Sequence, residues 1–421
     1  MNRATLDRRL GTRDAVVLGL ASMIGAGVFS VFAPAAGAAG DALLVGLALA
    51  AAVAYCNAVA SAQLAAAMPV SGGTYAYGRA RLGPWWGFTA GWGFVVGKSA
   101  SCAAMALTFA TYLVPGVWWE QRLVAAAAVA GLALLNLRGV TRTALLSRIL
   151  VSATVVALVV ALVGLWGGGA ARPESDFVVA GGTLGVLQSS GLLFFAFAGY
   201  ARIATMGEEV RDPARTIPRA IPLALGITVL LYAAVGMSLL AVLGPAALAA
   251  SSAPLDSAVR AAGAPALLPV VRGGAAVASL GALLALIAGV GRTVLAMARN
   301  RDLPRWLAAV DPVHRVPHHA EMTLAVAVGA LVLTLDVRGA IGFSSFGVLV
   351  YYAIANAAAF TQPSSERRWP RAVNVAGALG CAVLVVTLPP AAVVSGVAVF
   401  AVGLLGRVVA LRLRARTGAP D

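Results

Sequence analysis

Charged residues are scarce in this sequence. Only 11% of its 421 residues are Asp, Glu, Lys or Arg, while 60% are hydrophobic; soluble domains contain about 25% charged and about 45–50% apolar residues. A water-soluble core of this size could not bury so much apolar surface. The composition therefore excludes an ordinary soluble domain, a disordered chain and a disulfide scaffold.

Cysteine and histidine are rare too. The three cysteines, Cys56, Cys102 and Cys381, all lie in apolar stretches, so we interpret them as small hydrophobic residues and not as disulfides or metal ligands. The three histidines share one predicted loop: His314, His318 and His319. They do not form the ligand pattern of a zinc site. We expect no metal site, no cofactor and, because the spans hold no catalytic arrangement, no enzyme.

Long apolar runs are what the sequence does contain. A bilayer-spanning helix needs about 20 apolar residues. The charge-poor runs are 15–40, 42–78, 82–119, 123–137, 149–171, 177–201, 220–255, 273–291, 322–335, 339–365 and 372–406. Pro389-Pro390 divides the last run into two helices. The sequence therefore predicts an all-α integral membrane protein with about 12 transmembrane helices, of which the fourth and ninth are short.

The basic residues are distributed unevenly between the predicted loops. Loops on the side of the termini contain 23 arginines, whereas loops on the opposite side contain 5. Cytoplasmic loops carry such an excess in membrane proteins. We therefore expect both termini in the cytoplasm, and we interpret the net charge of +15 as a topology signal and not as a nucleic-acid surface. The preference for Arg over Lys, with abundant Ala, favours a bacterial cytoplasmic (inner) membrane.

Two predicted helices are interrupted by small residues. Gly25 and Gly27 lie in the first helix, and Gly199 follows three phenylalanines in the sixth. Matching interruptions five helices apart indicate a 5+5 inverted-repeat transporter with two extra C-terminal helices. A broken helix offers unpaired amides and carbonyls, which suit the carboxylate and ammonium of an amino acid. The alternative is that these glycines serve only close helix packing.

This architecture predicts where the chain divides. The expected parts are a cytoplasmic N-terminus (1–13), a first five-helix repeat (14–165), a second, inverted repeat (177–362), helices 11 and 12 (372–410) and a cytoplasmic tail (411–421).

Four segments resemble the amino acid–polyamine–organocation (APC) superfamily of amino acid permeases. They are Gly19–Phe29, Met68–Tyr77, Phe194–Tyr200 with its continuation to Ile221, and Gly291–Pro304. They occur in the usual order, in register with the twelve predicted helices. The resemblance implies amino acid transport by alternating access, with the substrate backbone held at the two breaks.

The resemblance also implies a set of substrate-binding residues. By motif position, these are Met23, Ile24, Gly25, Ala26, Gly27, Phe195, Phe197, Ala198 and Gly199. The carboxylate would meet amides near Ala26 and Gly27. The ammonium would meet carbonyls near Met23, Phe195 and Ala198. Phe195 lies where relatives place an aromatic gate that closes over the substrate.

Charged residues after helices 6 and 8 suggest a cytoplasmic gate. Glu208, Glu209 and Arg215 follow helix 6, and Arg292 and Arg299 end helix 8. Our hypothesis is that they form a network that closes the inward side. The alternative is that each is a solvated loop charge.

The usual ion-coupling residues of the superfamily are missing. Ala201 replaces an acidic residue, Thr154 replaces a lysine, and Gly281–Gly291 contains no hydroxyl for sodium. Lys98, the only lysine, lies deep in helix 3, where a charge costs about 2.5–3.5 kcal/mol. We hypothesise that Lys98 replaces the helix 5 lysine and exchanges a proton during transport. The alternative is a structural lysine that donates to backbone carbonyls or reaches an interface.

The substrate class follows from the missing acids. No Asp or Glu lies within a predicted helix core, so the sequence favours a neutral amino acid. Alternatives are an exchanger, a carrier of cationic amino acids, polyamines or other organic cations, and a nutrient sensor that does not transport. The oligomeric state is left open.

Overall fold

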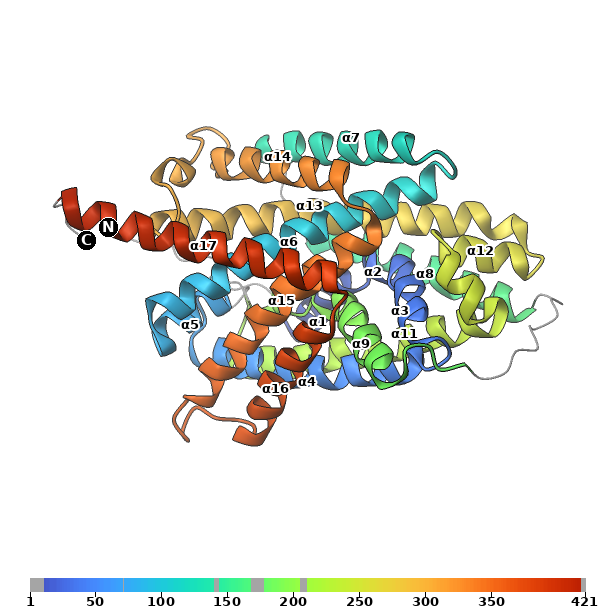
Figure 1. Ribbon diagram of the computed structural model, residues 1–421, viewed down its shortest axis with the longest axis horizontal. Coiled ribbons are helices and arrows are strands. Elements are labelled where there is room, and N and C mark those ends of the chain that lie inside the picture. Colours follow the sequence, from blue (N-terminus) through green and yellow to red (C-terminus); the bar gives the residue numbers. More distant parts are fainter. Residues whose placement is uncertain (1–10, 71, 140–143, 168–177, 205–209, 418–421) are drawn as a thin grey trace.

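The computed structural model describes residues 11–70, 72–139, 144–167, 178–204 and 210–417. Within these ranges every regular element is a helix, and one isolated bridge joins Gly40 to Val179. Many of the long helices run along the long axis of the molecule (Figure 1). Apolar side chains cover their outer surfaces, including Leu230 (73% exposed) and Val326 (75% exposed). Such a surface fits a protein that lies in a bilayer.

In the described part of the chain, nine helical segments are long and apolar enough to cross a membrane. They correspond to α1 (Thr12–Met23) with α2 (Gly27–Ser30), α4 (Leu43–Ala67), α6 (Pro84–Leu113), α7 (Trp118–Leu137), α8 (Ala144–Gly167), α11 (Pro213–Ala250), α13 (Leu268–Arg299), α15 (Val337–Phe360) and α17 (Pro390–Thr417). Three more are apolar but shorter: α9 (Gly182–Phe197), α14 (His318–Thr334) and α16 (Arg371–Thr387). The many-helix membrane fold is confirmed, and the count of twelve spans stays a prediction.

Short helices complete the architecture. They are α3 (Phe32–Ala39), α5 (Thr74–Leu82), α10 (Ala201–Ala204), α12 (Pro254–Ala261), η1 (Pro265–Leu267) and η2 (Arg305–Ala308). α5 and the end of α17 lie at the same end of the molecule, and α12 lies at the other (Figure 1).

Two of the predicted helices extend beyond their charge-free runs. α7 reaches 20 residues because it begins at Trp118, whose ring lies 5.1 Å from the guanidinium of Arg122. α14 begins at His318 and takes in the buried Glu321. Charged residues at helix ends are tolerated because their polar groups find partners or reach the interface.

The C-terminal region contains two helices on either side of the predicted turn. α16 ends at Thr387 and α17 begins at Pro390, so the turn expected at Pro389-Pro390 is confirmed. α17 then continues to Thr417, so the segment expected as a tail from residue 411 begins within a helix. Whether this segment lies in the cytoplasm stays a prediction.

α6 lies deep in the bundle and packs closely on α15. Gly97 approaches this helix so closely that an added Cβ would lie 3.0 Å from the Ser344 carbonyl oxygen. One turn on, the hydroxyls of Ser101 and Ser344 share a hydrogen bond of 2.7 Å. Small residues allow helix backbones to approach in a membrane. This packing fixes the segment of α6 that carries Lys98.

Candidate functional site

The first helix is interrupted where the glycines predicted a break. α1 ends at Met23, Ile24 leaves the helical region (φ −80°, ψ 66°), and α2 begins at Gly27. Val31, between α2 and α3, keeps helical dihedrals. The first amides of α2 have no partner within the helix. The break therefore supplies backbone donors at Ala26 and Gly27, both buried.

The sixth predicted helix is interrupted as well, and the two breaks lie against each other. α9 ends at Phe197, and α10 starts at Ala201 after a turn. A Cβ on Gly27 would lie 2.9 Å from the Cα of Ala196, and one on Gly199 would lie 2.2 Å from the carbonyl oxygen of Ser22. The close packing that the sequence left open for these glycines therefore applies here, and their role in substrate binding stays a prediction.

A tyrosine of α11 bridges the two breaks. The Tyr232 hydroxyl lies 2.6 Å from the carbonyl oxygen of Met23 and 3.1 Å from that of Ala196. The Met23 carbonyl also accepts the Gly25 amide at 2.8 Å. Sequence reasoning missed Tyr232, although a tyrosine inside an apolar run signals a hydroxyl that needs a buried partner.

Lys98 reaches the second break. Its ammonium nitrogen donates to the carbonyl oxygen of Ala198 at 3.2 Å, and the Tyr352 hydroxyl donates to the same oxygen at 3.2 Å. Lys98 is only 7% exposed. The Lys98 side chain is therefore hydrogen-bonded to one of the carbonyls that we expect to bind the substrate's ammonium. Tyr352 is a second residue that the sequence analysis did not single out.

The remaining predicted substrate residues line the same region. Met23, Ile24, Ala198, Phe195 and Phe197 are all 8% exposed or less. The Phe197 ring packs on Tyr232 with centroids 5.2 Å apart. A Cβ on Gly27 would lie 3.7 Å from the Phe195 ring, which places this aromatic beside the first break, where the gate was expected.

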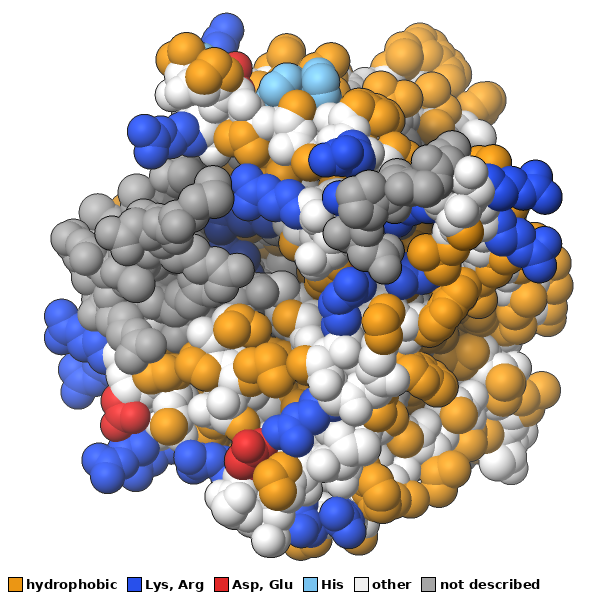
Figure 2. Space-filling model, turned by 90° about the vertical axis from the view of Figure 1, so that its left-hand side faces the viewer, with side chains coloured by type: hydrophobic (Ala, Val, Ile, Leu, Met, Phe, Trp, Pro, Cys, Tyr) orange, Lys and Arg blue, Asp and Glu red, His pale blue; other side chains and the backbone are white. Residues whose placement is uncertain are grey.

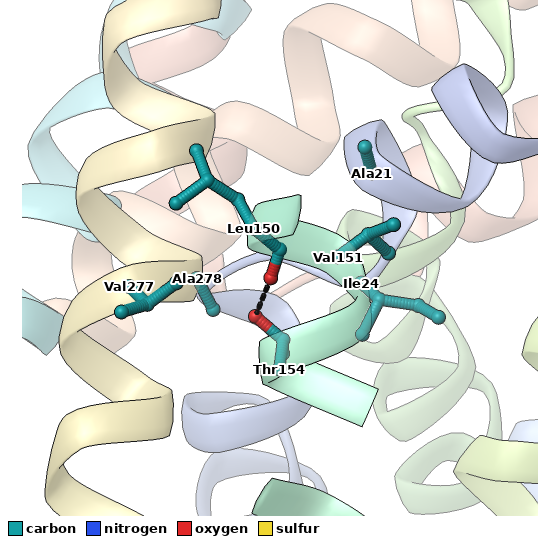
Figure 3. A pocket seen from close by; sticks show the side chains of 7 residues that line it. All are labelled: Ala21, Ile24, Leu150, Val151, Thr154, Val277 and Ala278. Carbon is teal, nitrogen blue, oxygen red and sulfur yellow. Dashed lines mark hydrogen bonds between the residues drawn. The ribbon is translucent and has the colours of Figure 1, made fainter. Parts of the chain in front are cut away.

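A small cavity lies where the first break meets α8 and α13 (Figure 3). It measures about 10 Å³ and is lined by Ile24, Thr154 and Ala278 among others. Thr154 donates to the Leu150 carbonyl of its own helix at 2.9 Å. Thr154, at the position where the resemblance implies a lysine in many relatives, thus faces the first break across this cavity. The cavity has room for about one water molecule.

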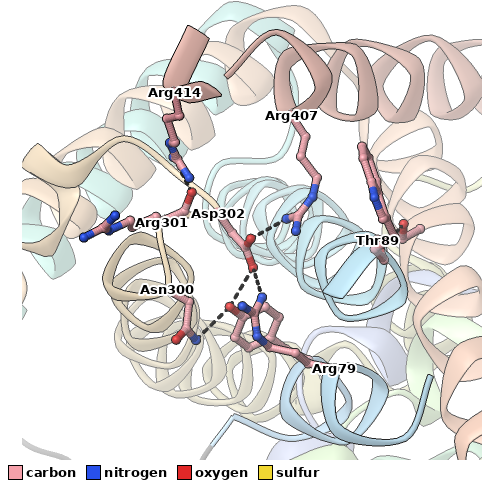
Figure 4. A network of polar contacts seen from close by, with 9 residues as sticks. Arg79, Thr89, Asn300, Arg301, Asp302, Arg407 and Arg414 are labelled. Carbon is pink, nitrogen blue, oxygen red and sulfur yellow. Dashed lines mark hydrogen bonds and ion pairs between the residues drawn. The ribbon is translucent and has the colours of Figure 1, made fainter. Parts of the chain in front are cut away.

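A polar network at the end of the molecule that carries α5 and the end of α17 is centred on Asp302 (Figure 4). Its carboxylate accepts Tyr75 at 2.8 Å and Arg79 at 3.1 Å, and it also pairs with Arg407. Asn300 donates to the Tyr75 hydroxyl at 2.9 Å. Burial, with the Asp302 carboxylate, raises the pKa of Tyr75 and keeps this hydroxyl a donor. The network joins α5, the segment after α13, and α17.

The predicted gating residues lie elsewhere. Arg215 pairs with Asp212 of its own segment at 3.7 Å. Arg292 is exposed at the α13 surface, and its charge acts on Glu321 of α14. Arg299 is exposed at the end of α13. Glu208 and Glu209 lie outside the described residues. Asp302 was missed, although it stands within one of the four family-like segments.

The histidine loop makes local contacts. His314 lies 3.3 Å from the Asp311 carboxylate, and His319 lies 2.9 Å from the Trp306 carbonyl. Amides of the same loop, that of His314 first, lower the pKa of Asp311. No cluster of three or more His, Cys, Asp or Glu that could hold a metal occurs among the residues placed by the structure.

Several known transporters are similar to this chain in sequence. The sequence profile of the amino acid permease family matches residues 10–406. The uncharacterized transporter Rv1999c of Mycobacterium tuberculosis (strain ATCC 25618 / H37Rv) is 59% identical over 400 residues, 95% of this chain and 90% of that protein. The branched-chain amino acid permease BcaP of Bacillus subtilis (strain 168) is 25% identical over 378 residues, 83% of this chain and 80% of that protein. Cationic amino acid transporter 7, chloroplastic, of Arabidopsis thaliana is 27% identical over 381 residues, 84% of this chain and 65% of that protein.

The family match spans both broken helices and all but the ends of the chain. It agrees with the resemblance carried by the four sequence segments and with the apolar helical bundle. The chain therefore belongs to the amino acid permease family of the APC superfamily.

Proposed function

We propose that this protein is a secondary active transporter that moves a neutral amino acid across a bacterial cytoplasmic membrane by alternating access, coupled to protons through Lys98. The observation that carries the proposal is the contact of the Lys98 ammonium with the Ala198 carbonyl at the break after α9. It places the only lysine of the chain at the site expected for the substrate.

The two breaks offer both kinds of group that an amino acid backbone needs. The amides at Ala26 and Gly27 begin a helical half, and the partial positive charge there suits a carboxylate. The carbonyls of Met23 and Ala198 suit an ammonium. Tyr232, Tyr352 and Lys98 hold these carbonyls in the present structure. Substrate binding then replaces internal hydrogen bonds, which keeps the buried carbonyls satisfied in both states.

Coupling follows from competition for the Ala198 carbonyl. Two ammonium groups within a few ångströms repel each other strongly in a site with little water. An incoming substrate ammonium therefore displaces Lys98 and favours the loss of its proton. Return of the empty carrier requires Lys98 to take up a proton and contact Ala198 again. In this mechanism Lys98 replaces the helix 5 lysine of relatives.

The charge of Lys98 also favours a neutral substrate. No Asp or Glu occurs at residues 15–40 or 177–207, which include both breaks. A cationic side chain would meet a resident cation and no carboxylate there. The named relatives include a branched-chain permease and a cationic transporter, so the alternative is a carrier of cationic amino acids. Arginine or putrescine as the strongest competitor for uptake would favour that alternative.

Transport in proteoliposomes tests the proposal. Counterflow with a panel of radiolabelled neutral amino acids identifies the substrate. With the membrane voltage clamped at zero and the inside more acidic, a gradient of one pH unit is worth about 1.4 kcal/mol per proton, which supports about tenfold accumulation by 1:1 exchange of substrate for a proton. Lys98→Gln is expected to abolish this accumulation and retain counterflow, because it keeps donor hydrogens but loses the charge.

Thr154→Ala is the matched control because it changes the position of the usual lysine. It is expected to keep proton-driven accumulation. Persistent accumulation by Lys98→Gln would refute coupling through Lys98. Absence of counterflow by the folded wild-type protein with every amino acid would refute transport itself and favour a sensor.

A further inference from the structure

A pocket of about 290 Å³ lies at the end of the molecule that carries the Asp302 network. Its walls come from three parts of the chain: the start of α6, the segment Arg301–Pro304 and the last turns of α17. None of the residues that line the pocket belongs to the helix breaks. Its function is therefore separate from the proposed transport site.

The pocket has an excess of positive charge. Three arginines line it, Arg301, Arg407 and Arg414, against the single acid Asp302. That carboxylate already accepts Tyr75 and Arg79 from outside the pocket. The surrounding face is rich in arginine side chains, with few acidic ones (Figure 2). The electrostatic field therefore favours an anion.

Arg407 supplies an unused donor in this pocket. The residue is 8% exposed, and its guanidinium lies 4.6 Å from the Phe88 ring centroid and 4.9 Å from that of Trp85. One of its terminal nitrogens pairs with Asp302, but the buried Nε–H has no partner in the part of the chain that the structure describes. A buried donor without a partner is costly. A ligand oxygen in the pocket would satisfy it.

The mouth of the pocket is apolar on the side of α17. Val402 is 68% exposed and Leu411 is 39% exposed, and both line the pocket. Trp85 and Trp86 at the start of α6 are 43% and 52% exposed, as is typical of the aromatic belt at a membrane interface. The pocket thus combines basic groups with an apolar edge, close to tryptophans of the kind that lie at a membrane interface.

We propose that this pocket binds an anionic phospholipid of the cytoplasmic leaflet. The phosphodiester group accepts hydrogen bonds from Arg407 and Arg414, and the acyl chains lie along the apolar edge at Val402. Basic pockets between transmembrane helices on the cytoplasmic side suit anionic headgroups. Charged acceptors strengthen the hydrogen bonds of arginine, which can also bind two oxygens at once. The bound lipid would link α6 to α17.

Native mass spectrometry of the full-length protein in detergent tests this site. We expect one tightly bound dioleoyl-phosphatidylglycerol and no equivalent binding of dioleoyl-phosphatidylcholine. Arg414→Glu is expected to weaken phosphatidylglycerol binding at least about tenfold, which is the loss of roughly one charge-assisted hydrogen bond. Arg412→Glu is the matched control, because Arg412 is exposed on the same helix outside the pocket.

Thermal unfolding of the same variants shows that each is folded. Equal binding of phosphatidylcholine, or an equal loss in Arg412→Glu, would overturn the proposal. If inorganic phosphate fully displaced phosphatidylglycerol, the site would bind the free anion, and the proposal of a lipid ligand would be overturned. Transport assays are not needed for these outcomes, so the lipid site and the transport mechanism fail or succeed separately.

Discussion

Single glycine positions decide how closely the two broken helices approach. A Cβ added at Gly199 or at Gly27 would meet main-chain atoms. A Cβ added at Gly25 would lie 2.9 Å from the Cβ of Ala282 on α13. A flexible side chain can move away, whereas the backbone of a packed helix cannot move without loss of neighbouring contacts. The sequence identified these glycines, but only the structure shows which atoms they face.

Gly199→Ala should therefore damage the site. Its Cβ would lie 2.2 Å from the Ser22 carbonyl oxygen, and relief of such a contact costs about 1–3 kcal/mol in a packed core. We expect a lower unfolding temperature and at least about a tenfold loss of counterflow. Gly289→Ala on α13 is the control, since an added Cβ there meets no atom within 4 Å. Equal behaviour of the two variants would contradict the close approach.

At the scale of elements, the Asp302 network ties α17 to α5 and the segment after α13. The side chains of Asp302 and Arg407 are 4% and 7% exposed. The sequence interpretation treated the arginines of this region as topology signals only. That interpretation could not find the network, because Asp302 and Arg407 are 105 residues apart in the sequence and meet only when α17 packs against α6.

Removal of the acid should destabilise this junction. Loss of one partner from a buried ion pair leaves an uncompensated charge and costs about 3–5 kcal/mol. We expect Asp302→Ala to lower the unfolding temperature in detergent, with partial recovery in the double variant Asp302→Ala/Arg407→Leu. Asp212→Asn should have little effect, because the Asp212–Arg215 pair is exposed. No recovery in the double variant would show that lost packing, and not the unpaired charge, is responsible.

Buried amides join another set of elements. Asn356 of α15 donates to Asn57 of α4 at 2.6 Å, and the thiol of Cys381 on α16 lies 3.3 Å from the same oxygen. Polar side chains hold transmembrane helices together through such contacts. The cysteine is a small buried residue, as the sequence indicated, but it also supplies a weak donor to this cluster.

For the whole molecule, the charge distribution predicts the orientation in the membrane. The arginine excess predicts that both termini and the histidine loop lie in the cytoplasm. The Asp302 network and the proposed lipid pocket then lie on the inner side. The loop before α7 lies on the outer side.

Cysteine labelling checks this orientation. In a Cys56→Ala background, where the other two cysteines are buried, Trp118→Cys and Val313→Cys offer exposed positions (67% and 79% in the wild type). We expect a membrane-impermeant maleimide to label Trp118→Cys in intact cells, and Val313→Cys only after permeabilisation. Labelling of Val313→Cys in intact cells would reverse the predicted topology.

The sequence by itself determined the family, the membrane-spanning class and the places where the first and sixth predicted helices break. These properties are local, since insertion depends on the apolar length of each segment and a break depends on nearby small residues. The tertiary structure decided which groups meet at the breaks and in the Asp302 network. Lys98 lies 100 residues from Ala198 in sequence, and Tyr232 lies 209 residues from Met23. A hydrogen bond depends on distance and direction within a fraction of an ångström, and helix packing alone sets these for residues so far apart along the chain.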